Sequence, residues 1–417
     1  MRYSFAEKVY LVRGAAKSCI YDVAHNRLLH LDNNDADTLC DLCSDKLKFL
    51  WFRHAFIGEM LENGIIEQRT DDVARKRSGS IAELFNEERP LRRAWVELTN
   101  RCNQKCIHCY NSCNDIPQKD MSVHDFKHVV DELTEYSLPS VILIGGEPFL
   151  LPEQDLFAML SYASQKLKSF ELFTNGTLCS VEQLKRIKES YPNCRFALSL
   201  HSFVPLEHER VTGIPGSYKK TRATLKALHD LKIPFRCVGT RIEGIETGVP
   251  EDLGCTYHCE DIRISGRASF ALFNAKSLKK RLVTEESFQF SDLNKALNDV
   301  HSSSCFAISV YIGADLDVCP CVMERRVKHG NLRGHSLNDV LTPQLRNFSK
   351  DDVEECCECE FRYLCEDCRP DSISDNPRAK PWYCTYNVKE GKWLDPDRYA
   401  DCLLHSMSSS QPTSSCL

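Results

Sequence analysis

Hydrophobic and polar residues alternate in different ways along this chain, and the first pattern covers residues 1–70. Short apolar runs at YLVRGA, SCIYDV and RLLHLD are separated by turn-like residues, which predicts a small antiparallel sheet. Apolar residues then recur at helical spacing over 35–43 and 56–63, where Gly64 follows as a C-cap and IIEQR as a strand. We therefore expect strands followed by helices, and then a charged linker over 71–91, with the charged stretch TDDVARKRSGS at its start.

The middle of the chain, residues 92–300, alternates strand-like and helix-like segments. Apolar or β-branched runs predict strands at AWVELT, SVILIGG, FELFTNG, RFALSLHS, FRCVGTRI and DIRISGR. Between them, MSVHDFKHVVDEL and VEQLKRIKES have the spacing of amphipathic helices, and Ser180 and Gln183 form a predicted capping box. This alternation predicts an α/β fold of parallel βαβ units that binds its ligands at the carboxyl ends of the strands.

Composition narrows the class of protein. The chain has 417 residues, of which 42% are hydrophobic and 27% charged, as in a globular protein of two or three domains. The net charge of −6 disfavours non-specific binding to nucleic acid. The sequence has no apolar run of about 18 residues and no secretory signal at its start, so we expect a cytoplasmic protein without a membrane segment.

The 23 cysteines are the unusual feature of the composition. They are fewer than the roughly 8 to 10% of a disulfide scaffold, and in a reducing compartment clustered thiols indicate metal or redox chemistry. Residues 301–400 combine dense cysteines with weak periodicity, so we expect a core held by metal there. The serine-rich tail, residues 401–417, is predicted to be disordered.

The strongest motif is C-x3-C-x2-C at Cys102, Cys106 and Cys109, directly after the first strand of the alternating region. Three thiolates on one loop can converge on a [4Fe-4S] cluster and leave its fourth iron without a protein ligand. A zinc knuckle is the alternative, but His108 and Cys113 do not complete a standard zinc spacing.

A second motif, Gly145–Gly146–Glu147–Pro148, ends the next predicted strand. The two glycines allow a ligand to approach the backbone, and the carboxylate of Glu147 can accept hydrogen bonds from an ammonium group. In isolation, an ordinary turn at the end of a strand would be the better interpretation.

Together these residues resemble the radical S-adenosylmethionine (SAM) family. The resemblance implies that Cys102, Cys106 and Cys109 hold a cluster whose open iron binds S-adenosyl-L-methionine. It implies further cofactor contacts at His108 (adenine), Gly145, Gly146 and Glu147 (ammonium), and Thr174, Asn175 and Ser199 (ribose and methionine). For the last three, a polar residue satisfied in a turn is the alternative. Thr212 stands where some relatives have an arginine that contacts the carboxylate, and no general base is assigned.

A third motif is C-x2-C-x5-C-x2-C at Cys356, Cys359, Cys365 and Cys368, followed by Cys384. Its two pairs are closer than the roughly 15 to 20 residues of a zinc ribbon. With Cys305 and Cys319 upstream, the motif resembles the SPASM extension, which carries two auxiliary [4Fe-4S] clusters. The resemblance implies that Cys356, Cys359, Cys365 and Cys384 hold one cluster and that Cys305, Cys319 and Cys368 hold the other. Cys321 and Cys255 are candidates for its fourth ligand, and Cys321 is equally compatible with a buried thiol.

The strands and helices of residues 1–70 resemble the winged-helix-like module that recognises precursor peptides in peptide maturases. A structural cap is the alternative. The complete resemblance implies a partial (β/α)6 TIM-like barrel between this module and a cysteine-rich SPASM-like domain.

The function that the resemblance implies is maturation of a ribosomally made precursor peptide (RiPP). A 5′-deoxyadenosyl radical would take a hydrogen from the peptide, an intramolecular crosslink such as a thioether would follow, and a flavodoxin or ferredoxin would donate electrons. A sulfatase maturase that forms formylglycine is the first alternative, but Pro320 follows Cys319 where such relatives have an aspartate. A zinc-binding scaffold without catalysis is the second, and the charge of −6 counts against a third, a modifier of tRNA or rRNA.

Overall fold

The computed structural model describes residues 2–44, 46, 53–69, 81, 84, 89–249, 254–302 and 305–406. Most of the predicted linker over 71–91 and the last residues, 407–417, lie outside the described part. The predicted start of the tail at residue 401 is wrong, because helix α13 (Pro396–Ser406) continues through it. Tyr399, Ala400 and Leu403 of this helix are buried, and their packing fixes the helix on the body of the protein.

The N-terminal region contains the predicted strands and helices. Strands β2 (Val9–Arg13), β3 (Lys17–Asp22) and β4 (Arg27–Asp32) form an antiparallel sheet, followed by α1 (Asn33–Cys43) and α2 (His54–Glu62). Gly64 ends α2 with a φ of 68°. The sequence pattern did not show that β1 (Arg2–Phe5) pairs with β5 (Ile66–Arg69), because this pairing joins the two ends of the region.

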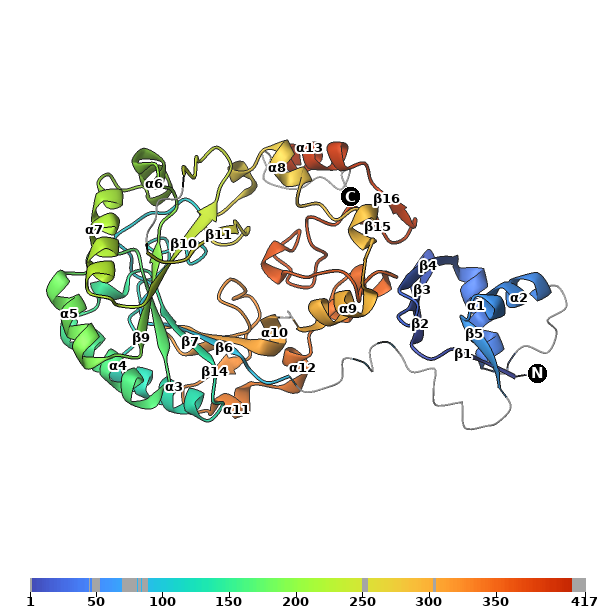
Figure 1. The fold of residues 1–417 in the computed structure, drawn as a ribbon, viewed down its shortest axis with the longest axis horizontal. Coiled ribbons are helices and arrows are strands. Elements are labelled where there is room, and N and C mark those ends of the chain that lie inside the picture. Colours follow the sequence, from blue (N-terminus) through green and yellow to red (C-terminus); the bar gives the residue numbers. More distant parts are fainter. Residues whose placement is uncertain are drawn as a thin grey trace.

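The central region is an α/β partial barrel, as expected from the alternating pattern (Figure 1). Its consecutive parallel strands are β6 (Arg93–Glu97), β7 (Ser140–Ile144), β8 (Phe170–Thr174), β9 (Cys194–Ser199), β10 (Phe235–Arg241) and β11 (Tyr257–Asp261). The helices on their outer side are α3 (Val123–Thr134), α4 (Glu153–Lys166), α5 (Val181–Ser190), α6 (Pro205–Thr212) and α7 (Ser217–Asp230). The capping box predicted at Ser180 and Gln183 begins α5. The link from β10 to β11 has no helix in the part that the structure describes.

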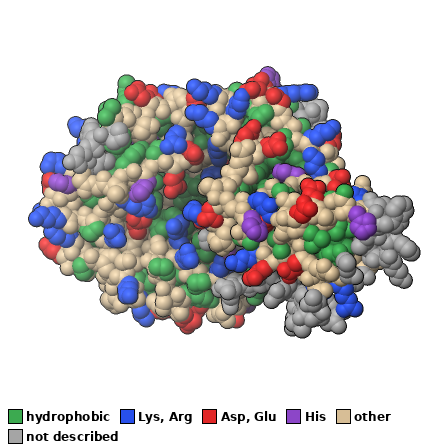
Figure 2. Space-filling view, turned by 45° about the vertical axis from the view of Figure 1, so that its right-hand side comes forward, with side chains coloured by type: hydrophobic (Ala, Val, Ile, Leu, Met, Phe, Trp, Pro, Cys, Tyr) green, Lys and Arg blue, Asp and Glu red, His purple; other side chains and the backbone are tan. Residues whose placement is uncertain are grey.

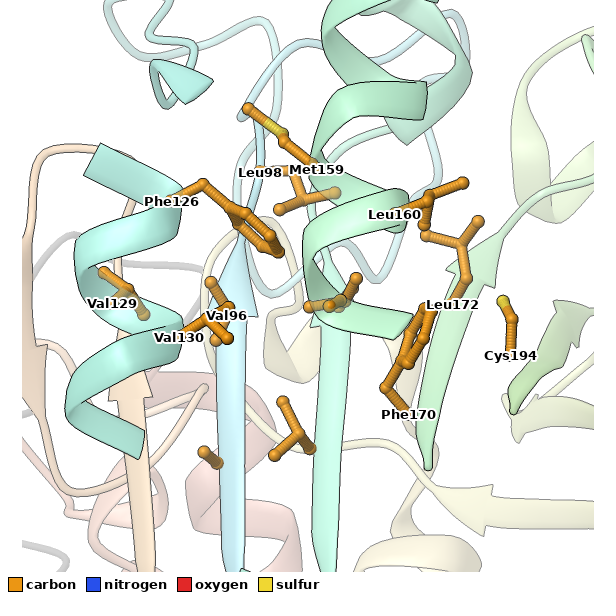
Figure 3. Packing of buried hydrophobic residues seen from close by; sticks show 14 of the residues in the cluster. Val96, Leu98, Phe126, Val129, Val130, Met159, Leu160, Phe170, Leu172 and Cys194 are labelled. Atoms are coloured by element: carbon orange, nitrogen blue, oxygen red, sulfur yellow. The ribbon is translucent and has the colours of Figure 1, made fainter. Parts of the chain in front are cut away.

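The main core lies between these helices and the strands. Figure 3 shows apolar side chains of α3 and α4 directed at the sheet, where they meet Val96, Leu98 and Leu172. All three of these residues are fully buried. This packing brings the carboxyl ends of the strands to one edge, where the loops of the motifs begin.

The last barrel strand lies earlier in the sequence than we predicted. We expected DIRISGR to be a strand, but β11 is Tyr257–Asp261 and pairs with Cys237–Arg241 of β10. Residues 262–267 form a loop that turns back over the barrel, where the backbone N–H of Arg267 donates to the carbonyl of Cys109 at 3.0 Å. Ile262 packs in a cluster with Val211 of α6, and Ile264 packs against the cluster that includes Trp382, so neither faces a neighbouring strand.

The C-terminal region continues the barrel sheet. Strand β12 (Ser309–Ile312) runs parallel to β6, and β13 (Asp317–Cys319) and β14 (Gly330–Asn331) follow antiparallel, which completes a nine-stranded sheet. The remaining helices and strands are α8 (Ala275–Lys279), α9 (Leu293–Ser302), α10 (Cys305–Ile308), α11 (Leu337–Val340), α12 (Pro343–Arg346), β15 (Tyr386–Asn387) and β16 (Lys392–Trp393). Short 3-10 turns are η4 (Pro148–Leu150), η5 (Phe270–Leu272), η6 (Glu285–Phe288), η7 (Lys350–Asp352), η8 (Cys356–Glu358) and η9 (Arg369–Asp371).

The N-terminal region packs on the C-terminal region and lies far from the barrel helices (Figure 1). Val12 and Tyr21 belong to the same apolar cluster as Phe361 and Tyr386. The Tyr21 hydroxyl also donates to the carbonyl of Glu360 at 2.7 Å. The described part of this region is therefore docked on the C-terminal region. None of the helices that the structure describes has the length and apolarity needed to cross a membrane.

Candidate active site

The cysteine loop follows β6 and lies at the carboxyl ends of the barrel strands. Cys102, Cys106 and Cys109 all line one cavity of about 240 Å³. Within the described residues, no three His, Cys, Asp or Glu side chains are close enough together to hold a single metal ion. The three thiols instead surround a shared space, which fits a multi-iron cluster that takes each thiolate at a different corner.

The backbone of this loop is held from two sides. The N–H groups of Lys105 and Ile107 donate to the carbonyls of Thr212 and Val211, at 2.9 and 3.0 Å, at the end of α6. Thr212, the residue in place of the family's arginine, is fully buried, and its hydroxyl shares a hydrogen bond of 2.8 Å with Ser217. Thr212 thus supports the cysteine loop through its backbone.

Arg267 clamps the loop from the other side. Its Nε donates to the carbonyl of Cys106 at 2.9 Å, and its Nη1 donates to the carbonyl of Cys113 at 2.6 Å and to Asp115 at 2.5 Å. Sequence reasoning missed this residue, because Arg267 lies more than 150 residues from the loop in the chain. The sequence pattern also assigned Arg267 to a strand, where a contact with the cysteine loop was not expected.

The two glycines of the second motif allow close contact between backbones. A Cβ on Gly145 would lie 2.4 Å from the Thr99 carbonyl oxygen, and one on Gly146 would lie 2.1 Å from that of Arg101. The N–H of Gly146 donates to Thr99 at 2.7 Å. Gly145 and Gly146 also line the cavity, but their first effect is to bind the start of the cysteine loop to the end of β7.

Glu147, the expected contact of an ammonium group, is held by hydrogen bonds within the protein. Its carboxylate is fully buried, does not line the cavity, and accepts from Thr174 Oγ1 and the backbone N–H of Asn175, each at 2.8 Å, and from the N–H of Phe149 at 3.1 Å. Burial raises the pKa of Glu147 to about 7. Glu147 therefore fixes the end of β8 from behind the cavity.

Thr174, Asn175 and Ser199 do line the cavity, as the resemblance implied. Asn175 Nδ2 donates to Asn103 Oδ1 at 2.8 Å and lies 4.0 Å from the Cys102 sulfur. These contacts join the end of β8 to the cysteine loop, and Ser199 at the end of β9 lines the same cavity.

Two neutral histidines form a wall of the cavity. The rings of His108 and His201 meet edge to face with centroids 4.6 Å apart. Burial, together with the charge of Arg267, lowers the pKa of His108 to about 4, and burial lowers that of His201 well below its usual value. The Nδ1 atoms of both are buried without a hydrogen-bond partner in the described structure, so each can bind a polar ligand.

Sequence reasoning did not identify His201 or several polar residues at the ends of β10 and β11. Thr240, Asp261, Arg263 and Ser265 also line the cavity. Their position at or just beyond the carboxyl end of a parallel strand is the signal that could have found them. Arg263 forms an ion pair at 2.9 Å with the fully buried Asp371, so the C-terminal region helps to close the site.

The protonation of the thiols differs within the loop. A hydrogen bond from Cys113 lowers the pKa of Cys109 to about 6, whereas burial raises that of Cys102 to about 11. Cys113 is buried behind Cys109 and was considered above only as a zinc ligand. Because a thiolate is the form that binds iron, the Cys113 hydrogen bond favours the ligating form of Cys109.

The C-terminal cysteines form two groups. Cys356, Cys359, Cys365 and Cys384 line one small cavity together with Lys350, as expected for one auxiliary cluster. Cys305, Cys321 and Cys368 line a neighbouring cavity of about 260 Å³, which Cys365 also borders.

Cys319 is not in the second group. It ends β13 and is buried in an apolar cluster with Ile142 and Tyr311. Cys321 takes its place: its thiol donates to Cys305 and lowers the pKa of Cys305. Cys255 is not in this group either. Its sulfur lies 3.5 Å from the sulfur of Cys237, which is buried in the main core of the barrel.

Comparisons with known proteins agree with this site. Residues 96–247 match the family model described as "Radical SAM superfamily". The chain is similar to an AdoMet-dependent heme synthase of Methanosarcina barkeri, with 31% identity over 34% of this chain and 40% of the relative. It is also similar to the antilisterial bacteriocin subtilosin biosynthesis protein AlbA of Bacillus subtilis, with 34% identity over 33% of this chain and 30% of the relative.

The alignment thus spans well under half of the length of these curated relatives. Among solved structures, native anSMEcpe with bound AdoMet has a similar fold, with a TM-score of 0.53 and 18% identity over 70% of this chain and 94% of that one. The matched residues include the whole cysteine loop and the ends of β6 to β10. The chain therefore carries a radical SAM domain, and the family expected from Cys102, Cys106 and Cys109 is confirmed.

Proposed function

We propose that this protein is a radical SAM peptide maturase that crosslinks a ribosomally made precursor peptide, with a thioether as the candidate bond. The observation that carries the proposal is the single cavity that joins three cysteine thiols to buried polar groups without partners, among them the Nδ1 atoms of His108 and His201. The bacteriocin biosynthesis relative supports a peptide substrate. The clustered thiols support a reducing, cytoplasmic setting.

Cys102, Cys106 and Cys109 would hold a [4Fe-4S] cluster, and Asn175, Ser199 and His108 would contact S-adenosyl-L-methionine. When bound, the cluster would pass one electron from a flavodoxin or ferredoxin to S-adenosyl-L-methionine. Cleavage of the sulfonium would then give the 5′-deoxyadenosyl radical that takes a hydrogen atom from the peptide. The protein's own residues hold the reactants and exclude water. The buried side chain of Ile144, at the end of β7, serves this purpose.

The two C-terminal cysteine groups would hold auxiliary clusters that accept the surplus electron when the crosslink closes. Cys356, Cys359, Cys365 and Cys384 form one ligand set. Cys305, Cys321 and Cys368 form the other, in which Cys321 replaces the expected Cys319.

Residues 1–70 would bind the leader segment of the precursor. In the order β2-β3-β4, the outer strands β2 and β4 each have one edge without a partner strand in the described sheet. Such an edge can add an extended peptide as a further strand.

The test uses anaerobically reconstituted full-length protein with dithionite, S-adenosyl-L-methionine and a co-expressed precursor peptide. We expect 5′-deoxyadenosine and a peptide mass lower by about 2 Da per crosslink, because closure removes two hydrogens. Colourless protein rich in zinc and without 5′-deoxyadenosine would overturn the proposal.

The same mass spectrum separates the formylglycine alternative, which would lower the mass of a cysteine peptide by about 18 Da and give an aldehyde. That route lacks its expected carboxylate here, since Pro320 follows Cys319 and Val322 follows Cys321. A 2 Da loss that leaves every thiol alkylatable would keep the crosslink but exclude a thioether.

A further inference from the structure

The barrel has a second cavity, of about 640 Å³, at the opposite end of its strands. The first residues of the strands line it, including Arg93 of β6, Ser140 of β7, Phe170 of β8 and Phe235 of β10. We call this cavity the amino-end mouth. Its lining residues beyond these include Arg195 of β9 and His258 of β11.

The amino-end mouth and the active-site cavity meet inside the barrel. The side chains that border both cavities are Trp95, Arg236, Glu260, Val322 and Met323. Only these shared side chains therefore lie between the two cavities, so a peptide bound in the mouth lies next to the active-site cavity.

The lining of the mouth has three arginines, Arg93, Arg195 and Arg236, against two carboxylates, Glu171 and Glu260. Arg236 is paired by two hydrogen bonds, of 2.8 and 2.7 Å, with Glu171. Arg93 and Arg195 have no carboxylate within ion-pair distance among the residues that the structure describes. The Arg93 guanidinium lies over the ring of Trp95, 5.7 Å from its centroid, and so points along the wall of the barrel interior.

This local excess of arginine contrasts with the net charge of −6 of the whole chain. Figure 2 shows Lys and Arg side chains along the hollowed middle of one face of the molecule. A cationic opening on an acidic protein attracts an anionic ligand selectively, and guanidinium groups pair well with carboxylates.

We propose that the amino-end mouth binds an acidic segment of the peptide substrate, with Arg93 and Arg195 as its carboxylate contacts. This inference rests on the proposed function, because it takes the substrate to be a peptide. The barrel strands are mostly five residues long. An extended peptide that runs alongside them therefore places its carboxylates about five residues from the position modified in the active-site cavity.

The test measures binding of two rhodamine-labelled peptides to reconstituted full-length protein by fluorescence anisotropy. One peptide alternates Glu and Gly, and the other has Gln in place of Glu. We expect the Glu peptide to bind about tenfold more tightly or better, and its affinity to fall as salt is raised from low to high concentration. We expect Arg93→Gln with Arg195→Gln to lower its affinity about tenfold.

Arg333→Gln is the matched control, because Arg333 is exposed and lines neither cavity. The affinity of this variant for the Glu peptide should equal that of the wild type. Arg195→Gln alone is measured as well, so that the conclusion does not depend on the double variant. Equal binding of the two peptides by the wild type, or unchanged affinity in both variants, would overturn the inference. Formation of 5′-deoxyadenosine without peptide is measured in the same samples, and its loss in the wild type would count against the proposed function instead.

Discussion

Cys106 is the middle cysteine of the loop and borders the active-site cavity, so its substitution tests the proposed cluster directly. A cluster short of one thiolate cannot be held with its fourth iron free, so we expect Cys106→Ala to lose the iron of this cluster and all formation of 5′-deoxyadenosine. Iron analysis and chromatography of the reaction products measure both effects.

Cys194→Ala is the matched control. Cys194 is equally a free thiol, but it is buried in the main core at the start of β9 and lines no described cavity (Figure 3). We expect it to keep cluster and cleavage, with a modest loss of stability. Wild-type cleavage by Cys106→Ala would contradict the assignment of the loop.

Gly146 tests the geometry of the loop instead of its ligands. The Cβ of Gly146→Ala would lie 2.1 Å from the Arg101 carbonyl, so the start of the cysteine loop must move. We expect most of the radical SAM cluster, about four irons per chain, to be lost while the fold persists. Iron content and far-ultraviolet circular dichroism separate these effects, and Gly58→Ala, which meets nothing within 4 Å, should leave iron content unchanged.

Cys319 and Cys321 give opposite expectations although only one residue separates them. Cys321 borders the cavity of Cys305 and Cys368, whereas Cys319 faces Ile142 and Tyr311. We expect Cys321→Ala to lose about four irons per chain, and Cys319→Ala to keep them and lose only packing energy. The reverse result in iron analysis and Mössbauer spectra would restore Cys319 as the ligand.

At the level of elements, the loop after β11 holds the cysteine loop in place through Arg267. Arg267→Met keeps the apolar stem but removes the hydrogen bonds to the carbonyls of Cys106 and Cys113. We expect the variant to bind the cluster but to lose iron to a chelator several-fold faster than the wild type, because each lost charged hydrogen bond costs about 1.5–3 kcal/mol.

Arg210→Met is the control for this loop, since Arg210 is an exposed residue of α6 that pairs with Glu207. Its rate of iron loss should match that of the wild type. Equal rates for Arg267→Met and wild type would show that the loop after β11 does not hold the cluster site.

At the level of the whole molecule, the N-terminal region is part of the C-terminal core. The Tyr21 hydroxyl donates to the carbonyl of Glu360, next to Cys359 of one auxiliary group. Removal of residues 1–69 would expose the apolar cluster around Phe361 and Tyr386. We expect the truncated protein to melt at a lower temperature and to modify its peptide poorly, while cleavage of S-adenosyl-L-methionine persists.

A single substitution tests the same contact without truncation. Tyr21→Phe leaves the buried carbonyl of Glu360 without this donor and should lower stability by about 1–3 kcal/mol. Tyr136→Phe, on a half-buried ring with no side-chain hydrogen bond in the described structure, should change it little. Unaltered peptide modification by the truncated protein would reduce the N-terminal region to a structural cap.

The sequence alone determined the barrel strands up to β10, strands β2 to β5 and the helices of the N-terminal region, and the position of the cysteine loop. These are local properties, because apolar periodicity and the spacing of Cys102, Cys106 and Cys109 depend on residues close together in the chain. The carboxyl-end placement of Thr174 and Ser199 followed from the parallel arrangement.

Only the tertiary structure decided which groups turn toward a shared space. Cys321 borders the cavity of Cys305 and Cys368, whereas Cys319, two positions earlier, is buried in an apolar cluster. The carboxylate of Glu147 is buried outside the active-site cavity. Arg267 and Asp371 act on residues more than 100 positions away, which no local pattern records. The amino-end mouth also depends on assembly of the whole sheet, because its arginines come from β6, β9 and β10, which are separate in sequence.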